Sequence, residues 1–442
     1  RQSIHPAYLL SLSPETLAHW LPRLVDCLES RGTGVGVFLV NLEDGHPLLV
    51  CSSPDAPFLV DSLLVQLKSR EIPFHLICHP SFPALREKNQ LLRLGAQAGD
   101  APRESLILAE LAVLPETATE LVPPIHQALS AALTVEHARD GLEKRLAAIQ
   151  SMAESGGHDD FWQWLADGNF LPFAYRRHRV AKKEDGAGWA FELQEEGHLG
   201  ISLPAEAGAG MRRRLETRLP VAVETTAVAS PLLRAEKLVA IGCLEARAGV
   251  FCEVHEFFGL FSEKVRGEPA WQVPALRRRI EEALSRSGLS RGSHGYRNTV
   301  KIFNAFPQVE LFFLDAKELA AAVCSVAAMS RDTLVRIIAA ASPTLSGLTL
   351  FLILPRGSFS VETMARVERY LRRFFSAPAA EISLVQVTTE HSLHHARLLP
   401  RHEPVHFDPA VLERCLSRML RPWTGRLRRL LEHAHGEAEG RR

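Results

Sequence analysis

One order of secondary structure recurs along this chain, and it limits the fold more than any other feature of the sequence. Apolar runs short enough for strands flank stretches with helical spacing of apolar residues. In the first part of the chain the predicted strands are 48–52, 74–78 and 105–113, and the predicted helices are 58–67 and 116–152. The resulting order of strand, helix, strand, strand, helix is typical of a ferredoxin-like βαββαβ sandwich, in which helices cover an antiparallel sheet. The fold class is therefore predicted to be α+β.

A further helix and strand precede this unit, and a linker follows it. Leu17, Leu21 and Leu24 recur at helical spacing and predict a helix over residues 5–31, which ends at Gly32. The next residues predict a strand over 35–42. The glycine-rich stretch 154–157 is expected to be a linker.

The middle of the chain is predicted to be mostly β. A short helix is expected over 159–166, and the Gly/Ala-rich and then basic stretch 205–214 is expected to be a surface loop. Runs rich in β-branched and aromatic residues predict strands at 170–180, 189–194, 221–228, 238–245 and 251–260.

The last part of the chain returns to the first pattern. The predicted helices are 274–286, 316–328, 361–375 and one that starts at 408. The predicted strands are 299–305, 309–314, 335–341, 348–354 and 382–388. From about residue 330 the order is compatible with another small sandwich, and the final helix continues to the end of the chain.

Composition and charge exclude several classes of protein. The chain of 442 residues carries 51 Lys and Arg against 51 Asp and Glu, and 46% of its residues are hydrophobic. Balanced charge gives no electrostatic reason to expect a nucleic acid or an acidic membrane as partner. The hydrophobic content excludes disorder over most of the chain. No apolar run reaches the roughly 18 residues of a membrane span, and no signal peptide is visible.

The cysteines indicate a reducing compartment. There are seven, an odd number, and they are widely spaced with no C-x-x-C. Most lie in apolar runs, where a free cysteine behaves as a small hydrophobe. We therefore expect no disulfide framework and a cytoplasmic location. Because the chain begins with Arg1 and stops in a charged stretch that is predicted to be helical, we also expect it to be part of a longer protein.

The common catalytic motifs are absent from the sequence. There is no P-loop and no G-x-S-x-G elbow, and His255-Glu256 lacks the second histidine of an H-E-x-x-H zinc motif. The glycines of residues 32–36 precede a strand, whereas a dinucleotide loop precedes a helix. No catalytic or cofactor-binding residue is therefore predicted.

A group of histidines near the end of the chain leaves a metal site as one reading. Imidazoles at alternate positions of a strand share a face and could bind zinc, as in a metal hydrolase. The group contains His391, His394, His395, His402 and His406. No Cys or Asp lies close by, and strand spacing puts His394 and His395 on opposite faces. Structural or surface histidines are favoured, and no metal ligand is predicted.

A candidate effector site lies at the start of the helix 58–67. A helix N-terminus offers free N–H groups and the positive end of the helix dipole, which suit an anionic or zwitterionic ligand. Asp55 is expected to be the N-cap, and the strand ending at His79 lies beside it. The candidate effector-binding residues are Asp55, Pro57, Phe58, Asp61, Ser62 and His79. The alternative is an ordinary capped helix with Phe58 in the core.

Several segments, taken in order, resemble the large bacterial NAD-specific glutamate dehydrogenases. Residues 55–62 (DAPFLVDS) resemble the family's D-M-P-F-L-V-D-S segment, and 74–80 resemble its following strand that ends in H-P. Further similar segments are the E-S strand at 103–107, F-L-x-W-L-x-D-x-x-F at 161–170, F-L-G-L-F at 257–261, Y-P-R-D-E-L-F at 305–312 and V-P-R at 354–356. The tail from Trp423 resembles the start of a helical region. The sequence departs from the motifs at Ala56, at Gln308-Val309 and at Gly357.

The resemblance implies a regulatory and oligomerisation region that lacks the catalytic domains. It implies an N-terminal helical segment (1–32), ACT-like domains at 33–154, 158–290 and 291–404, and the start of a helical region (405–442). The whole enzyme would oxidise L-glutamate to 2-oxoglutarate and ammonium with NAD, which binds further along the chain, so no cofactor is expected in this segment. The implied partners are a second copy of the chain, its own C-terminal catalytic domains and an amino-acid effector. The alternative is a free-standing ACT-type amino-acid-binding module.

Overall fold

The computed structural model describes most of the chain. The described residues are 14–32, 34–41, 47–152, 159–183, 188–216, 221–247, 250–266, 268–306, 311, 314, 316–327, 329, 335–341, 348–358, 360–387, 391–398, 407–420, 431 and 434. Some predicted features lie outside them: the start of the first helix, the linker at 154–157, most of the strand at 309–314, and nearly all of the tail from 423.

The first antiparallel sheet has two strands at its centre, β2 (Pro47–Pro54) and β6 (Arg103–Leu111). β1 (Gly36–Asn41) pairs with the free edge of β2, and β3 (Phe74–Cys78) pairs with the other edge of β6. β4 (Ser81–Glu87) also pairs with β6 and forms a hairpin with β5 (Gln90–Leu94). The predicted order of strands and helices is confirmed, and the β4–β5 hairpin is an insertion that the pattern did not predict.

This first sheet is covered on both faces, because successive residues of β2 are apolar. Leu48 and Val50 pack with α2 (Pro14–Ser30). Leu49 and Cys51 face the opposite way and pack with α3 (Leu59–Ser69) and α4 (Pro115–Met152). A strand buried on both faces has apolar residues at consecutive positions rather than alternating ones.

The second sheet has the strand order β8-β7-β11-β10-β9, with all neighbours antiparallel. Its strands are β7 (Phe170–Lys182), β8 (Trp189–Gly200), β9 (Val221–Ala229), β10 (Lys237–Arg247) and β11 (Val250–Phe261). One face is covered by α5 (Asp159–Trp164), the π-helical turn Leu165–Asn169 and the second half of α4. The other face carries α6 (Ala209–Glu216). The prediction of a mostly β middle region is confirmed.

The predicted surface loop at 205–214 is wrong, because most of its second half is helix α6. Met211 and Leu215 lie four residues apart on this helix and are fully buried against the sheet. The arginines between them had suggested a solvent-exposed stretch.

Helices connect the second sheet to the third. The described part of this connection contains α8 (Pro274–Arg286), α9 (His294–Ala305) and α11 (Ala316–Ala327), and the short helix α7 (Glu263–Arg266) precedes them. The predicted strand at 299–305 is wrong: Ser293 caps α9 by accepting a hydrogen bond from the backbone N–H of Tyr296 at 3.2 Å. Thr299, Ile302 and Phe303 are buried at helical spacing.

The third sheet has the order β12-β13-β15-β14. Its strands are β12 (Arg336–Ala341), β13 (Leu348–Pro355), β14 (Ala380–Val387) and β15 (His391–Leu398). Helices α12 (Val361–Phe374) and α13 (Pro409–Leu420) cover one face. Single 3-10 turns at Gly95–Ala98, Ala270–Gln272 and Arg356–Ser358 complete the elements of the described residues.

The three sheets share one arrangement of strands. In each sheet, a helix lies in the connection between two strands, and a strand later in the sequence lies between these two. In the first sheet, α3 lies in the connection from β2 to β3, and β6 lies between them. The corresponding elements are α6, β7, β10 and β11 in the second sheet, and α12, β13, β14 and β15 in the third. An extra strand pairs with the outer edge of the first one, namely β1, β8 and β12. The tandem α+β sandwiches predicted from the sequence are thereby confirmed.

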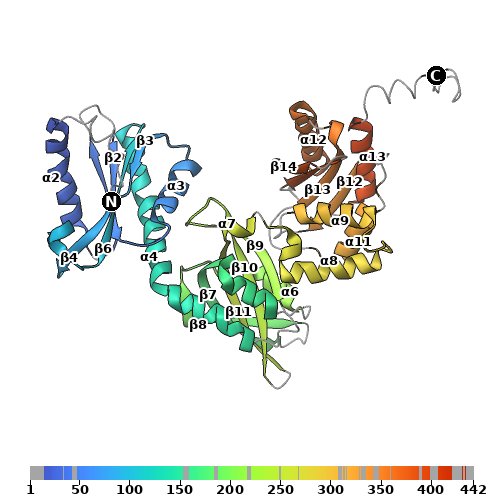
Figure 1. Cartoon of the computed structure of the whole chain (residues 1–442), viewed down its shortest axis with the longest axis horizontal. Coiled ribbons are helices and arrows are strands. Elements are labelled where there is room, and N and C mark those ends of the chain that lie inside the picture. The colour runs from blue at the N-terminus through green and yellow to red at the C-terminus, as the bar shows by residue number, and fades with distance from the viewer. Residues whose placement is uncertain are drawn as a thin grey trace.

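A single long helix joins the first two sheets. α4 is 38 residues long and runs from the first sheet down to the second (Figure 1). Most of its buried residues recur at spacings of three or four and form a stripe along one side of the helix. Leu121, Ile125 and Leu129 pack against the first sheet, and Leu142 and Leu146 pack against the second. Both cores therefore depend on one face of one helix.

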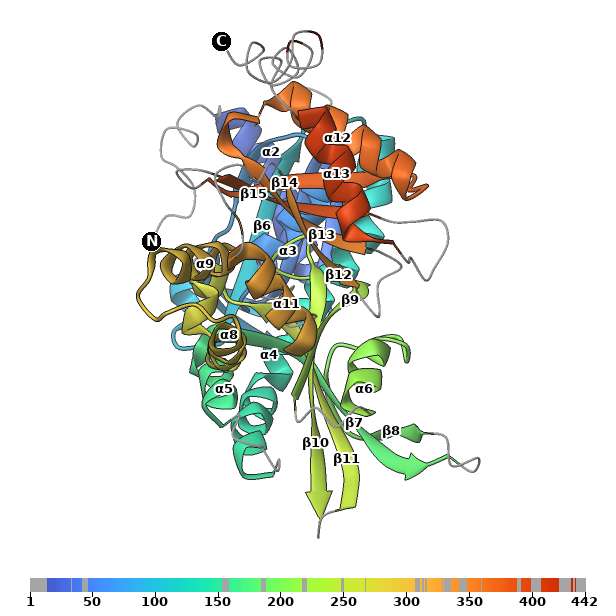
Figure 2. The same ribbon diagram turned by 90° about the vertical axis from the view of Figure 1, so that its right-hand side faces the viewer.

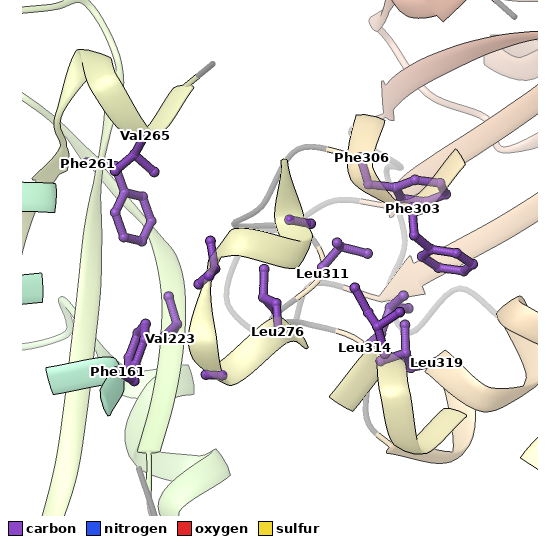
Figure 3. Packing of buried hydrophobic residues seen from close by; sticks show 14 of the residues in the cluster. Phe161, Val223, Phe261, Val265, Leu276, Phe303, Phe306, Leu311, Leu314 and Leu319 are labelled. Atoms are coloured by element: carbon purple, nitrogen blue, oxygen red, sulfur yellow. The ribbon is translucent and has the colours of Figure 1, made fainter. Parts of the chain in front are cut away.

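The second and third sheets are joined by a continuous apolar cluster. Phe261 and Val265 lie on the side of the second sheet, and Leu276 of α8 lies in the middle (Figure 3). Phe306 continues the cluster, and the centroid of its ring lies 4.2 Å from that of Phe351 on β13. Figure 2 shows that the β10–β11 hairpin projects beyond these helices as a ribbon, with β7 paired to β11 as far as Glu253.

A buried ion cluster anchors α6 to the second sheet. Glu256 of β11 is fully buried and accepts hydrogen bonds of 2.7 Å from Arg176 of β7 and from Arg212 of α6. Burial alone raises the pKa of the Glu256 carboxyl, and the two guanidiniums counteract this rise. The same arginines donate to the carbonyls of Pro204 and Ala205, which lead into α6. The cluster therefore fixes the whole connection.

A histidine beside this cluster should make folding sensitive to acid. The side chain of His178 is buried, and burial together with Arg212 and Arg176 lowers its pKa to about 3. Below pH 6.5 the unfolded chain therefore binds a proton that the folded chain does not, so stability falls as the pH falls. Between pH 7 and pH 5, His178 should contribute a loss of about 2 kcal/mol in the free energy of unfolding.

The variant His178→Gln should remove that contribution, whereas Gln at the exposed His126 should keep it. Urea unfolding at pH 7 and pH 5 measures the difference. Equal pH dependence in wild type and His178→Gln would show that the folded protein accommodates the imidazolium.

A glycine of the second sheet should not tolerate a side chain. A Cβ on Gly259 of β11 would lie 2.0 Å from the carbonyl oxygen of Leu171 on β7. Gly259→Ala must push β7 and β11 apart, and we expect it to lower the free energy of unfolding by about 1–3 kcal/mol. Gly357→Ala is a matched control, since its Cβ would meet nothing within 4 Å. Urea denaturation with the same midpoint for Gly259→Ala and wild type would contradict this packing.

Candidate functional site

The structure brings together two of the predicted effector residues, Asp55 and His79. The Ser105 hydroxyl donates to one carboxylate oxygen of Asp55, and His79 Nε2 lies 2.9 Å from the same hydroxyl oxygen. Because that hydroxyl gives its proton to Asp55, it accepts from the Nε2–H of His79. The Ser81 hydroxyl donates to the other Asp55 oxygen at 2.8 Å. The Asp55 carboxylate is thus held in place while a third of its side chain stays exposed.

The expected role of Asp55 as N-cap is wrong. The N-cap of α3 is Phe58, whose backbone has φ 67° and whose side chain makes no capping hydrogen bond. Asp55 instead turns toward the serines of β4 and β6. The first backbone N–H groups of α3 therefore have no side-chain cap and remain suited to an anionic group.

Sequence reasoning missed three residues of this cluster: Ser81, Arg103 and Ser105. Arg103 Nε donates to Ser81 Oγ at 3.0 Å and lies 3.9 Å from an Asp55 oxygen. Ser81 and Ser105 face each other in the register of β4 and β6. The E-S motif contains Ser105, but only the pairing with the unpredicted strand β4 places Ser81 beside it.

The remaining predicted site residues lie outside this hydrogen-bonded group. Pro57 and Asp61 are exposed, and Ser62 is fully buried on the inner side of α3. Phe58 is half-buried, and its ring meets that of Phe173 on β7 edge-on, with centroids 6.0 Å apart. The loop at the candidate site is therefore also a contact between the first and second sheets.

Burial favours the neutral form of His79. Removal from water lowers the pKa of the imidazole, and the nearby Asp55 carboxylate opposes this shift. A neutral imidazole that donates from Nε2 has Nδ1 as its acceptor nitrogen. The cluster thus presents one carboxylate, one neutral imidazole and one guanidinium beside an uncapped helix.

A second polar chain lies within the second sheet. The Tyr175 hydroxyl lies 2.7 Å from His255 Nδ1, and His255 Nε2 lies 2.9 Å from a carboxylate oxygen of Glu245. Burial lowers the pKa of His255 and raises that of Tyr175. Glu253 completes the group, since it has a ligand atom within 4.8 Å of those of His255 and Glu245. Within the described residues, these are the side chains arranged so that they could hold a metal ion.

Three histidines of the C-terminal group, His391, His394 and His395, lie on β15. His394 is buried and bonds to the Ser392 hydroxyl at 2.9 Å, and burial lowers its pKa to about 4. His395 stacks on Phe351, with ring centroids 5.3 Å apart. The two imidazoles pack on opposite faces of the strand, while His402 and His406 lie outside the described residues.

Other expectations from the sequence can be compared with the structure. All of the cysteines are free. None of the helices in the described ranges is long and apolar enough to cross a membrane.

Comparison with known proteins gives two matches to family models. Residues 40–121 match the model described as glutamate dehydrogenase, ACT1 domain. The match covers the first sheet apart from most of β1, together with α3 and the start of α4. Residues 273–332 match glutamate dehydrogenase, helical motif 1, which corresponds to α8, α9 and α11.

Curated relatives share the same description, NAD-specific glutamate dehydrogenase. The protein from Halomonas elongata is 24% identical over 86% of this chain and 25% of its own length. The protein from Pseudomonas aeruginosa is 23% identical over 96% of this chain and 28% of its own length. The protein from Mycobacterium tuberculosis is 25% identical over 76% of this chain and 21% of its own length. This chain thus spans about a quarter of the relatives that it matches.

The resemblance indicated by the sequence motifs is therefore confirmed: over most of its length this chain is similar to part of the NAD-specific glutamate dehydrogenases, and it carries their ACT1 domain and helical motif 1.

Proposed function

We propose that this chain is the regulatory and assembly region of a longer cytoplasmic NAD-dependent glutamate dehydrogenase. The observation that carries the proposal is the strand topology. Every strand pair among the described residues is antiparallel, whereas dinucleotide-binding folds are built on a parallel sheet. The chain is similar to only about a quarter of each relative, which agrees with a regulatory region that is separate from the catalytic domains.

The rest of that longer protein would catalyse the reaction. There NAD would bind, and L-glutamate would be oxidised to 2-oxoglutarate and ammonium. This region would contact its own catalytic domains and a second copy of the chain. We propose the domain division given above, with ACT-like domains at 33–154, 158–290 and 291–404 between a helical segment (1–32) and the start of a further helical region (405–442).

The effector would be a free amino acid bound at the start of α3. Its carboxylate would accept hydrogen bonds from the uncapped N–H groups after Phe58. Its ammonium group would pair with the exposed part of the Asp55 carboxylate, which Ser81 and Ser105 orient. His79 supports this arrangement from behind through Ser105.

The position of Phe58 provides a route from this site to the second sheet. Phe58 belongs to the loop that would close around the ligand, and its ring rests on the fully buried Phe173. A ligand that shifts the start of α3 must also shift this contact, because buried aromatic rings are closely packed. The shift caused by the ligand would then be transmitted directly to β7, which carries Phe173.

Ligand binding can be tested by thermal unfolding of the chain with individual amino acids. An amino acid that binds only the folded state stabilises it by about 2.7 kcal/mol at a hundred times its Kd, and the unfolding temperature rises accordingly. Asp55→Asn should abolish the rise, and Asp100→Asn, at an exposed aspartate, should keep it. An equal rise for Asp55→Asn would place the ligand elsewhere, and no rise with any amino acid would exclude an amino-acid effector.

The proposal that the catalytic residues lie outside this region can be tested separately by mixing the purified chain with L-glutamate and NAD. We expect no formation of NADH, because the residues that bind NAD and transfer hydride would lie in the remainder of the longer protein. Turnover above that of a heat-denatured sample would contradict the proposal.

A further inference from the structure

A group of metal-ligating side chains lies near the far end of the second sheet. Glu245 lies on β10, and Glu253 and His255 lie on β11, the two strands of the projecting ribbon (Figure 2). One ligand atom of each residue lies within 4.8 Å of the other two. This face of β11 is opposite to the one that carries Glu256, so the group is separate from the ion cluster that anchors α6.

The imidazole of His255 is held in a fixed orientation. Its side chain is only 3% exposed, and Nδ1 bonds to the hydroxyl of Tyr175 at 2.7 Å. Nε2 is thereby directed at the carboxylates and lies 2.9 Å from Glu245. Histidine ligands of metal ions are commonly oriented in this way, with the second ring nitrogen hydrogen-bonded to a neighbouring group.

The two carboxylates face each other across the ribbon. Glu245 and Glu253 are direct partners in the register of β10 and β11, and like charges at such positions destabilise a sheet. Arg177 of β7 donates to both oxygens of Glu253, at 3.1 and 3.4 Å, and so orients that carboxylate. A β-bulge directly after Glu245 shifts the register of β10 and β11, and such a bulge bends the strand.

We propose that Glu245, Glu253 and His255 bind a single divalent metal ion of the zinc class. One imidazole nitrogen and two carboxylate oxygens are ligands that zinc accepts, and water would complete the coordination. The carboxylates are 12% and 20% exposed, which leaves a route for the ion.

Metal binding is compatible with the hydrogen bonds of His255. The ion would take the place of the proton on Nε2, and that proton would move to Nδ1. The Tyr175 hydroxyl can then accept from Nδ1–H rather than donate to it. The ion would tie β10 to β11 and act as a structural link in the ribbon. This role is independent of the proposed regulation by amino acids.

The experiment is a calorimetric titration of the chelator-treated full chain with Zn²⁺. We expect one ion per chain and a higher unfolding temperature in its presence. Glu245→Gln and Glu253→Gln should each weaken binding at least tenfold, as should His255→Gln. Glu245→Gln and Glu253→Gln each relieve a like-charge pair, so circular dichroism should show that these two variants stay folded. Glu192→Gln, at an exposed glutamate of β8, should bind as wild type does.

Cobalt provides a second readout of the same site. Co²⁺ bound by wild type should give visible absorption bands that depend on its ligands, and His255→Gln should change or remove them. Absence of binding by wild type would overturn the proposal. Equal affinity and equal spectra for wild type and all variants would also overturn it, because they would show an adventitious ion held by other surface groups only.

Discussion

The structure depends first on the apolar stripe of α4. A helix of 38 residues is about 57 Å long, far longer than either sheet needs for its own cover. Its first part is buried against the first sheet and its second part against the second. The two sheets therefore cannot unfold or rotate independently without exposing part of the same stripe. The cluster around Leu276 extends this connection to the third sheet, so packing links all three (Figure 3).

The candidate effector site lies where the first of these connections is made. Phe58 is held in the left-handed region, a conformation that costs a bulky residue about 1–2 kcal/mol. Its contact with Phe173 helps to offset that cost. The loop that leaves the start of α3 uncapped is thus also the loop that rests on the second sheet. In the proposed function, this coincidence lets a small ligand affect the whole region.

Periodicity in the sequence was sufficient to predict most of the elements, including α4, the strands of the second sheet, and β12 and β13. It failed where tertiary packing overrides local signals. The segment 299–305 contains β-branched residues, yet its burial follows a helical period in α9. The arginines of α6 look solvent-exposed in the sequence, but Arg212 is buried because Glu256 pairs with it. Neither the β4–β5 hairpin nor β15 was predicted.

The candidate site shows the same limit. Asp55 and His79 stand out in the sequence, because Asp55 precedes a predicted helix and His79 directly follows a predicted strand. Ser81, Arg103 and Ser105 do not. The register of β2 and β6 brings Arg103 and Ser105 to Asp55, and the pairing of β4 with β6 adds Ser81. Likewise, the ligands Glu245 and Glu253 meet only through the register of β10 and β11.

Hydrogen exchange along α4 tests the central claim most directly, namely that the first two sheets share one helix and form one body. The measurement compares wild type with Leu129→Ala, which weakens only the part of the stripe that packs on the first sheet. The account predicts faster exchange of the amides throughout α4, including those around Leu142 and Leu146 on the second sheet. Faster exchange confined to the part around Leu129, with unchanged protection beyond it, would contradict the claim.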